Sequence, residues 1–131
     1  GNPVLIKYLN DVKYSFNSYT MDQTALSCGV AAVKDEAHFQ ETTDKIKKTR
    51  ENAKVELAKL GFSFPDSKAN FLFITHPEYQ AKDLFQALRE EGIYVRYFAQ
   101  PRIDNYLRVT IGTDGQMEAL YAFLRQYMGK A

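Results

Sequence analysis

The sequence predicts an α/β fold, a two-layer sandwich in which a small mixed sheet carries helices on one face. Helical patterns fill residues 1–60, and the short apolar runs that are typical of strands all come later, with further helical patterns between and after them. The chain has 131 residues, of which 45% are hydrophobic and 25% charged, and this is the size and composition of one globular domain. We therefore expect a single domain without disulfide support.

Two helices are predicted before residue 35. Asn2 and Pro3 suit the N-cap and the first turn of the first helix. An irregular segment is expected over residues 14–19, and Thr20 or Asp22 can cap a second helix that is rich in small residues. The apolar residues of the first helix recur on one face: Val4, Leu5, Tyr8, Leu9 and Val12.

A third, highly charged helix is predicted from about Asp35 to Leu60, with Gly61 as the residue that ends it. Its apolar stripe consists of Phe39, Ile46, Ala53, Leu57 and Leu60. We expect its other faces to be solvated and to carry ion pairs at helical spacing. These faces hold Glu41, Asp44, Lys45, Lys47, Lys48, Arg50, Glu51, Lys54 and Glu56.

After Gly61 the pattern changes to that of strands. Residues 62–65 suggest a short edge strand that Pro65 ends, and residues 69–75 form an apolar run that predicts a buried strand. A helix is expected over residues 81–91, and Gly92 ends it. This order makes a βαβ unit with the strand that follows, so these two strands are expected to run parallel.

Two further strands and a last helix complete the chain. The strands cover about residues 93–98 and 106–112, and the loop between them is short enough to predict an antiparallel pair. Thr113 and Gln116 have the spacing of a capping box, which predicts the start of the last helix.

Each of these last two strands carries one arginine, Arg96 or Arg108, among apolar residues. The period of two places both arginines on the face opposite the aliphatic side chains. A guanidinium group binds carboxylate or phosphate through two parallel hydrogen bonds, so the pair suggests an anion-binding site. The alternative is that each arginine only forms a salt bridge with a nearby Asp or Glu.

The sequence contains no evident catalytic group. Cys28 lies among small helix residues, which predicts a buried and inert thiol. His76 could act as a general base, but its position before a proline at a strand end favours a structural role. The lysines fall on helix exteriors, so none is expected to have the depressed pKa that Schiff-base chemistry needs. One cysteine and two distant histidines make no zinc site.

Charge and composition count against several classes of function. The 17 basic and 16 acidic residues give a net charge of +1, which argues against binding to nucleic acid through many phosphates. No apolar run approaches the roughly twenty residues of a membrane span, and no signal peptide opens the sequence. A single cysteine permits no internal disulfide, so a reducing cytoplasmic compartment is expected.

Several segments together resemble the histidinol-phosphate aminotransferases, and the resemblance extends over essentially the whole chain. The segment Leu107–Gly112 alone is typical of the broader pyridoxal-phosphate (PLP) transaminases, and Val95–Phe98 at this spacing makes the narrower match specific. The segments that carry it are Gly1–Pro3, Phe16–Asn17, Ser67–Phe71, Val95–Phe98, Pro101–Arg102 and Tyr106–Thr113.

The resemblance implies that residues 1–131 correspond to the C-terminal small domain, with its linking helices, of a fold-type I PLP-dependent aminotransferase. It implies that the large domain, with the Schiff-base lysine and the PLP site, lies outside this chain, so that the chain alone is inactive and binds no PLP. The implied reaction transfers an amino group between histidinol phosphate and 2-oxoglutarate in histidine biosynthesis, in a cytoplasmic homodimer.

The resemblance also implies roles for three residues. Arg108 matches the arginine that binds the acid group of each substrate, and Arg96 matches a second arginine that helps to hold the substrate phosphate. Asn17 matches an asparagine at the edge of the active site. The segment Tyr14–Asn17 lacks the proline that often precedes the Tyr/Phe-Asn pair of the family, which puts the role of this loop in doubt.

Three alternatives remain open from the sequence. The chain could belong to an aminotransferase or decarboxylase of the same family that acts on another phosphorylated or aromatic amino acid. It could be a stand-alone module that binds anions or single-stranded RNA through arginine and tyrosine side chains on its sheet, although the near-neutral charge counts against this. It could also be a structural or regulatory domain whose arginines only make salt bridges.

Overall fold

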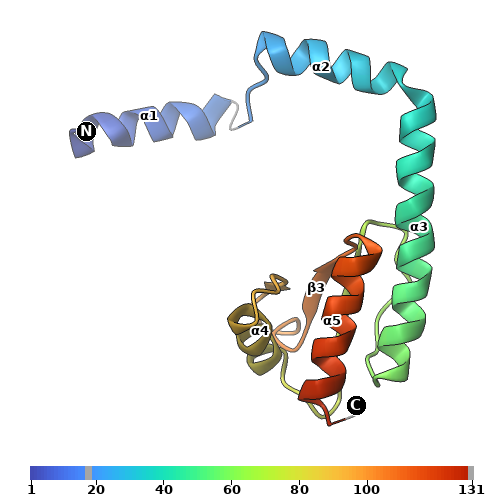
Figure 1. Cartoon of the computed structure of the whole chain (residues 1–131). Coiled ribbons are helices and arrows are strands. Elements are labelled where there is room, and N and C mark those ends of the chain that lie inside the picture. Colours follow the sequence, from blue (N-terminus) through green and yellow to red (C-terminus); the bar gives the residue numbers. More distant parts are fainter. Residues whose placement is uncertain (17–18, 130–131) are drawn as a thin grey trace. The chain divides into compact units, whose positions relative to one another are not determined.

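The computed structural model describes residues 1–16 and 19–129 of the chain (Figure 1). Two compact units divide the chain, residues 1–40 and residues 41–131. Each unit is described by itself below.

Residues 1–40 contain helices α1 (Pro3–Phe16) and α2 (Gln23–Lys34) and the start of α3 (Glu36–Lys59). The Asn2 side chain accepts a hydrogen bond from the backbone N–H of Val4 at 2.9 Å, as expected for a helix start. Asp22 is the N-cap of α2 and accepts from the N–H of Ala25 at 2.7 Å. The irregular segment was predicted from residue 14, but α1 continues to Phe16, and residues 17 and 18 lie outside the described residues.

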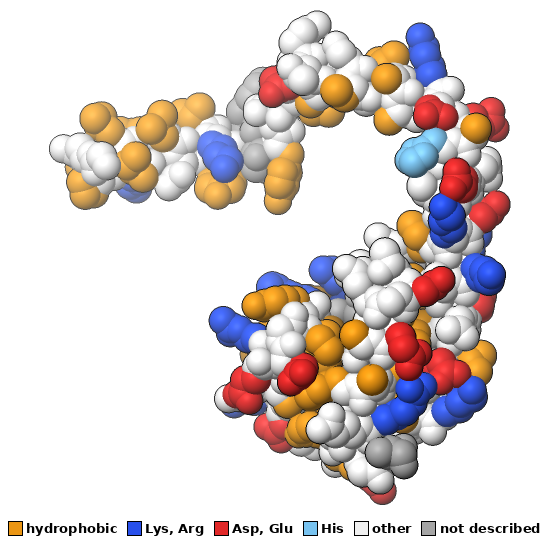
Figure 2. Space-filling view, viewed as in Figure 1, with side chains coloured by type: hydrophobic (Ala, Val, Ile, Leu, Met, Phe, Trp, Pro, Cys, Tyr) orange, Lys and Arg blue, Asp and Glu red, His pale blue; other side chains and the backbone are white. Residues whose placement is uncertain are grey.

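Every described side chain of residues 1–40 is exposed, including the apolar ones (Figure 2). Cys28 is exposed, so the prediction of a buried thiol is wrong. The small residues of α2 offer a surface for close packing, and no described part of residues 1–40 buries it. The most exposed large apolar side chains of this unit are those of Leu5, Leu9, Val12, Tyr14, Tyr19, Met21 and Val33.

Residues 41–131 form an α/β unit, as predicted. After α3 come β1 (Phe71–Ile74), α4 (Ala81–Glu90), β2 (Arg96–Tyr97), β3 (Leu107–Thr110) and α5 (Asp114–Tyr127). Gly61 and Gly92 follow α3 and α4 with φ angles of 97° and 80°, a left-handed conformation that favours glycine. Thr113 and Gln116 form the predicted capping box of α5.

The sheet has the strand order β1-β3-β2, with β3 in the centre. Both pairs are antiparallel, so the prediction of a mixed sheet is wrong in its pairing. Strands β1 and β2 point the same way, as the βαβ pattern predicts, but β3 lies between them. The physical reason is the loop over residues 98–106, which lets the chain turn back and insert the last strand between the other two.

The strands are shorter than the apolar runs that predict them. The expected strand over residues 93–98 pairs only at Arg96–Tyr97. The expected edge strand at residues 62–65 is a single bridge between Ser63 and Thr75. Pro65 lacks the N–H that a longer ladder needs.

The core lies on one face of this sheet, which confirms the two-layer arrangement. Leu72 and Ile74 of β1 and Leu107 and Val109 of β3 are buried, and the helices α3, α4 and α5 contribute their inward side chains to the same cluster. Figure 1 shows α5 alongside the second half of α3. The helix residues at the centre of this core are Ala53, Leu57, Leu84, Leu88, Leu120, Tyr121 and Leu124.

Candidate anion-binding site

The strands β2 and β3 place Arg96 and Arg108 on the face of the sheet that the helices leave open. Along β3 the side chains alternate between buried and exposed, with Leu107 and Val109 buried and Arg108 and Thr110 exposed. Arg96 is exposed in β2. The predicted separation of arginines from aliphatic residues is confirmed, since a strand turns successive side chains to opposite faces.

The register makes the two arginines direct neighbours. Arg96 pairs with Arg108 across β2 and β3, and Phe73 pairs with Arg108 across β1 and β3. One row across the open face therefore reads Phe73, Arg108, Arg96. Side chains in such cross-strand positions have Cβ atoms about 5 Å apart, so both guanidinium groups can reach one small ligand.

No carboxylate among the described residues lies within ion-pair distance of either arginine. The alternative in which each arginine holds a nearby Asp or Glu is therefore not realised in residues 1–16 and 19–129. Like charges in directly opposed positions destabilise a sheet. An anion that binds between them relieves this repulsion.

Aromatic rings lie next to both arginines on the open face. The Cζ atom of Arg108 lies 5.5 Å from the ring centroid of Phe71, and that of Arg96 lies 5.5 Å from the ring centroid of Phe98. Phe73 stacks on Tyr106 at 4.6 Å and meets Phe98 edge-on at 6.1 Å. The alternation in the sequence places Phe98 and Tyr106 on the arginine face. Phe71 and Phe73 were not predicted there, although the period of two sets them opposite the buried Leu72 and Ile74.

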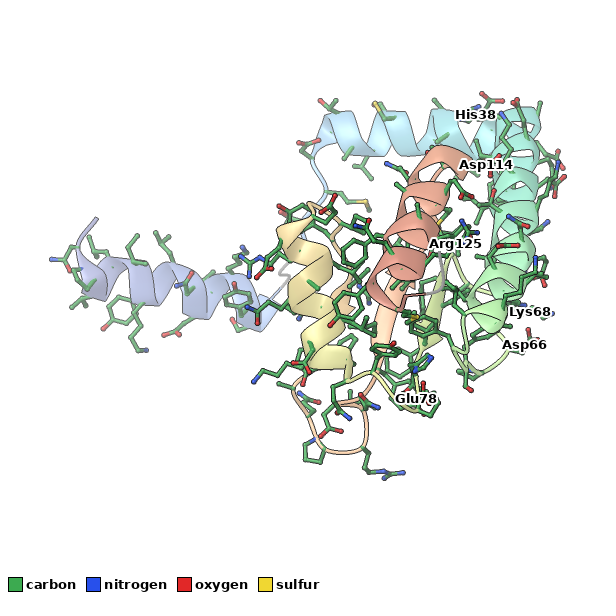
Figure 3. The ribbon with its side chains drawn as sticks, turned by 60° about the horizontal axis from the view of Figure 1, so that its bottom comes forward. His38, Asp66, Lys68, Glu78, Asp114 and Arg125 are labelled. Atoms are coloured by element: carbon green, nitrogen blue, oxygen red, sulfur yellow. The ribbon has the colours of Figure 1, made fainter. Side chains whose placement is uncertain are left out.

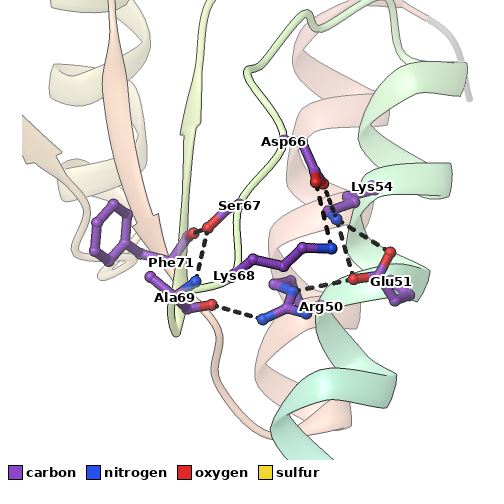
Figure 4. Close-up of polar contacts among 8 residues, drawn as sticks. All are labelled: Arg50, Glu51, Lys54, Asp66, Ser67, Lys68, Ala69 and Phe71. Atoms are coloured by element: carbon purple, nitrogen blue, oxygen red, sulfur yellow. Dashed lines mark hydrogen bonds and ion pairs between the residues drawn. The ribbon is translucent and has the colours of Figure 1, made fainter.

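The segment that leads into β1 is held by Arg50 of α3 (Figure 4). Arg50 is only 7% exposed, and its Nη1 donates to the carbonyl oxygen of Ala69 at 3.1 Å. The next carbonyl, that of Asn70, accepts from the N–H of Ile111 at 2.8 Å and so joins the start of β1 to the end of β3. The prediction of a solvated position is wrong for Arg50, because residues 66–70 pack over this face of the helix.

Lys54 lies at the centre of an ion-pair network next to Arg50. Its Nζ is 3.0 Å from a carboxylate oxygen of Glu51 and 2.7 Å from one of Asp66. The Lys54 side chain is only 15% exposed, so the prediction of a solvated position is wrong for this residue as well. Hydrogen bonds from Lys54 hold the pKa of both Glu51 and Asp66 below their ordinary values, and the two carboxylates raise the pKa of Lys54. Asp66 and Lys68 lie beside the end of α3 (Figure 3).

The loop between the two arginine strands is fixed by Asn105. Its Oδ1 accepts from the N–H of Ala81 at 2.8 Å, and its Nδ2 donates to the carbonyl oxygen of His76 at 3.4 Å. The Asn105 side chain thus pairs the backbone N–H of the first residue of α4, which has no partner within the helix, and connects the loop to the residues that follow β1.

His76 is buried and both of its ring nitrogens are engaged. Nδ1 accepts from the N–H of Glu78 at 3.1 Å, and therefore the neutral ring carries its proton on Nε2, which lies 3.2 Å from the carbonyl oxygen of Leu60. The rings of Phe62 and Tyr79 pack against it edge-on, with centroids 5.1 and 4.9 Å away. The structural role is confirmed, and no free nitrogen remains for proton transfer.

The described residues do not fit a PLP Schiff base or a metal ion. Every described lysine except Lys54 is exposed, and Lys54 is bound by two carboxylates. Residues 1–16 and 19–129 contain no cluster of His, Cys, Asp and Glu that could hold a metal. Asn17, the third predicted site residue, lies outside the described residues.

The described part of the chain contains no helix long and apolar enough to cross a membrane.

Comparison with known proteins identifies the family. The sequence model of the aminotransferases of class I and II matches residues 1–124. A histidinol-phosphate aminotransferase of Lactococcus lactis subsp. lactis is 49% identical over 130 residues, which are 99% of this chain and 36% of that protein. One of Brachyspira hyodysenteriae is 48% identical over 118 residues, or 90% of this chain and 33% of that protein. The chain thus spans about a third of the length of these curated relatives.

Solved structures share the fold. The histidinol-phosphate aminotransferase of Clostridium acetobutylicum superposes with a TM-score of 0.78 at 22% identity, over 92% of this chain and 37% of that one. The enzyme of Sinorhizobium meliloti, solved in complex with pyridoxal-5′-phosphate, gives a TM-score of 0.72 at 21% identity, over 86% of this chain and 32% of that one. The chain belongs to the class I and II aminotransferase family.

Proposed function

We propose that residues 1–131 are the C-terminal small domain of a PLP-dependent aminotransferase that transfers an amino group between histidinol phosphate and 2-oxoglutarate. The observation that carries this proposal is the pair Arg96 and Arg108, which are cross-strand neighbours on the open face and have no carboxylate partner among the described residues. The identity of 48–49% to histidinol-phosphate aminotransferases supports the choice of substrate.

In this proposal Arg108 binds the carboxylate of 2-oxoglutarate and its amino-acid product, and it helps to hold the acid group of the phosphorylated substrate. Arg96 holds the phosphate. Each guanidinium group offers a planar fork of donors that matches an anion with two oxygens. Asn17 contributes to the edge of the active site. The contribution of this chain is therefore to bind and orient the substrate.

The cofactor and its lysine belong, in this proposal, to the two thirds of the enzyme that the chain does not span. The state of Lys54 supports this assignment, because two carboxylates raise its pKa and so stabilise the ammonium form, which cannot attack an aldehyde. When bound there, PLP supplies the electron sink for the reaction. This chain supplies no step of that chemistry.

The apolar surface of residues 1–40 supports a large partner within the same enzyme. Exposed side chains such as Leu5, Leu9 and Val12, which are 62–68% exposed, are unusual for helices that stand alone in water. We assign this surface to contacts with the large domain of a cytoplasmic, homodimeric enzyme. The expected consequence is that α1 and α2 exchange their amide hydrogens rapidly in the isolated chain and slowly in the whole enzyme.

The proposal is tested with the full-length enzyme that carries these residues. Arg108→Lys should lower kcat/KM at least tenfold for both half-reactions, because lysine cannot form the paired hydrogen bonds. Arg96→Ala should raise the KM for histidinol phosphate much more than the KM for 2-oxoglutarate. Arg89→Ala, an exposed arginine of α4, is the control and should change neither. Unchanged turnover in both site variants would refute the proposal.

The fold alone does not select the reaction. A decarboxylase of Sulfurospirillum multivorans shares it with a TM-score of 0.73 at 19% identity. The same preparation should therefore be assayed for release of carbon dioxide from amino acids as well as for amino-group transfer. Decarboxylation without transamination would favour the second function.

A further inference from the structure

Each of the two arginines has an aromatic ring of its own. The guanidinium carbon of Arg108 lies 5.5 Å from the ring centroid of Phe71 in β1, and that of Arg96 lies 5.5 Å from the ring of Phe98, which follows β2. Both distances are within the range of a cation–π interaction. The two rings come from different parts of the sheet, so the two contacts are independent.

The two rings lie at different places around the arginine pair. Arg96 and Arg108 begin as opposite residues of one antiparallel pair. Phe71 pairs with Thr110, so its ring is a diagonal neighbour of Arg108 on the β1 side of the central strand. Phe98 lies two residues beyond Arg96 along its own strand. The ring of Phe71 thus lies on the β1 side of Arg108, whereas the ring of Phe98 reaches toward β1, where it meets Phe73.

The ring beneath Arg96 is itself held in place. Phe98 meets Phe73 edge-on at 6.1 Å, and Phe73 stacks on Tyr106 at 4.6 Å. Phe71 lies in the paired part of β1, directly after the segment that Arg50 anchors. Fixed rings limit the number of conformations that the long arginine side chains sample before a ligand binds.

We propose that Phe71 and Phe98 are positioning residues, of which Phe71 orients Arg108 and Phe98 orients Arg96, so that each guanidinium group is held in place as an anion receptor before a ligand binds. This inference rests on the proposed function, in which both arginines bind anionic groups of the substrate. Loss of a ring should weaken the adjacent receptor about two- to fivefold, the range expected for an exposed cation–π contact. The other receptor should remain unchanged.

The first test measures arginine mobility by NMR relaxation of the Nε–Hε groups in the full-length enzyme that carries these residues, without substrate. Phe71→Leu should increase the mobility of Arg108 and leave that of Arg96 unchanged, and Phe98→Leu should do the reverse. Phe71→Tyr and Phe98→Tyr keep a ring and should behave as the original protein. Phe123→Leu removes a half-buried ring of α5 that stacks on Tyr127 and serves as the matched control.

The second test titrates the same variants with inorganic phosphate and follows the shift of each Nε–Hε signal. Phe71→Leu should lower the phosphate affinity about two- to fivefold at Arg108 only, and Phe98→Leu should do so at Arg96 only. Equal mobility in all variants would overturn the positioning role even where phosphate binds. If each ring loss mobilises only its own arginine but phosphate shifts neither signal, the positioning role is kept and the proposed function is contradicted.

Discussion

Arg96 and Arg108 are register partners across strands β2 and β3, and both side chains are exposed on the face that the helices leave open. No described acidic residue neutralises them. The two positive charges therefore repel each other in the ligand-free sheet, and a ligand with anionic groups would relieve this repulsion. Such a local cost is expected where a sequence maintains a binding site at the expense of stability.

The first prediction concerns this repulsion. Arg96→Gln should stabilise the ligand-free chain by about 0.5 kcal/mol at low ionic strength, because it removes one of two opposed like charges. The gain should shrink in about 0.5 M salt, where the Debye length is only a few ångströms. Urea unfolding at low and high salt measures both values.

Inorganic phosphate provides the control for this prediction. It should stabilise the original chain and stabilise Arg96→Gln less, because the variant has lost one receptor. A variant that is less stable than the original chain at low salt would mean that the contact of Arg96 with the Phe98 ring outweighs the repulsion from Arg108.

The second prediction concerns His76. His76→Ala should lower the free energy of unfolding by about 3 kcal/mol, since it opens a cavity between two rings and leaves backbone groups unpaired. His76→Phe fills the volume but removes both hydrogen bonds, and it should cost about 1–2 kcal/mol. Chemical denaturation measures both changes.

Enzyme kinetics separate this structural role of His76 from a role as general base. In the full-length enzyme His76→Phe should retain kcat at a temperature where the variant is folded, because no ring nitrogen is available for proton transfer. A loss of kcat by orders of magnitude in a folded variant would contradict the structural role.

The third prediction concerns acid stability. Lys54 lowers the pKa of Glu51 and Asp66 below their ordinary values of 4.5 and 3.8. A carboxyl group with a lowered pKa stabilises the fold above its ordinary pKa, and this contribution is lost as the pH falls through the folded value. The raised pKa of Lys54 adds no loss in acid, because the ammonium group stays protonated there.

The urea midpoint should therefore fall as the pH decreases from about 5 to about 3, and Lys54→Met should reduce this dependence. Lys82→Met changes an exposed lysine of α4 and should leave the pH profile as it is. An identical profile for both variants would show that the network around Lys54 does not control acid stability.

The placement of Arg96 and Arg108 on one face was predictable from the sequence, because the two-residue period of a strand requires no tertiary information. The caps at Asp22 and Thr113 and the helix end at Gly61 were predictable for the same reason, since each depends on a few neighbouring residues. Arg96 and Arg108 were predicted as a pair, and they are register partners across β2 and β3. Their binding role remains a proposal.

Features that depend on register or on packing between distant segments could not be predicted. The contact of Phe71 with Arg108 requires the pairing of β1 with β3, whereas the βαβ pattern predicted β1 and β2 as neighbours. Arg50 has the spacing of a solvated helix residue and is buried only because residues 66–70 cross over it. Cys28 lies among small residues that usually pack, yet nothing described covers it.

The last prediction concerns Tyr121 on the inner face of α5. Its ring is almost fully buried at 1% exposure, and among the described residues its hydroxyl group has no hydrogen-bond partner. Burial, together with the nearby Glu56, raises its pKa from 10.0 to about 12. Because the folded state keeps the proton more tightly, this residue contributes stability that is lost as the pH rises above about 10.

Tyr121→Phe removes an unsatisfied polar atom and keeps the ring. It should raise the free energy of unfolding by up to about 1 kcal/mol at neutral pH and weaken the loss of stability between about pH 10 and 12. Tyr127→Phe, on the exposed side of the same helix, is the matched control and should change little. Thermal and urea unfolding of both variants measure the difference. If Tyr121→Phe instead lowers the free energy of unfolding, the hydroxyl group must have a hydrogen-bond partner in solution, for example a water molecule that bridges to Glu56. Its burial would then not destabilise the fold.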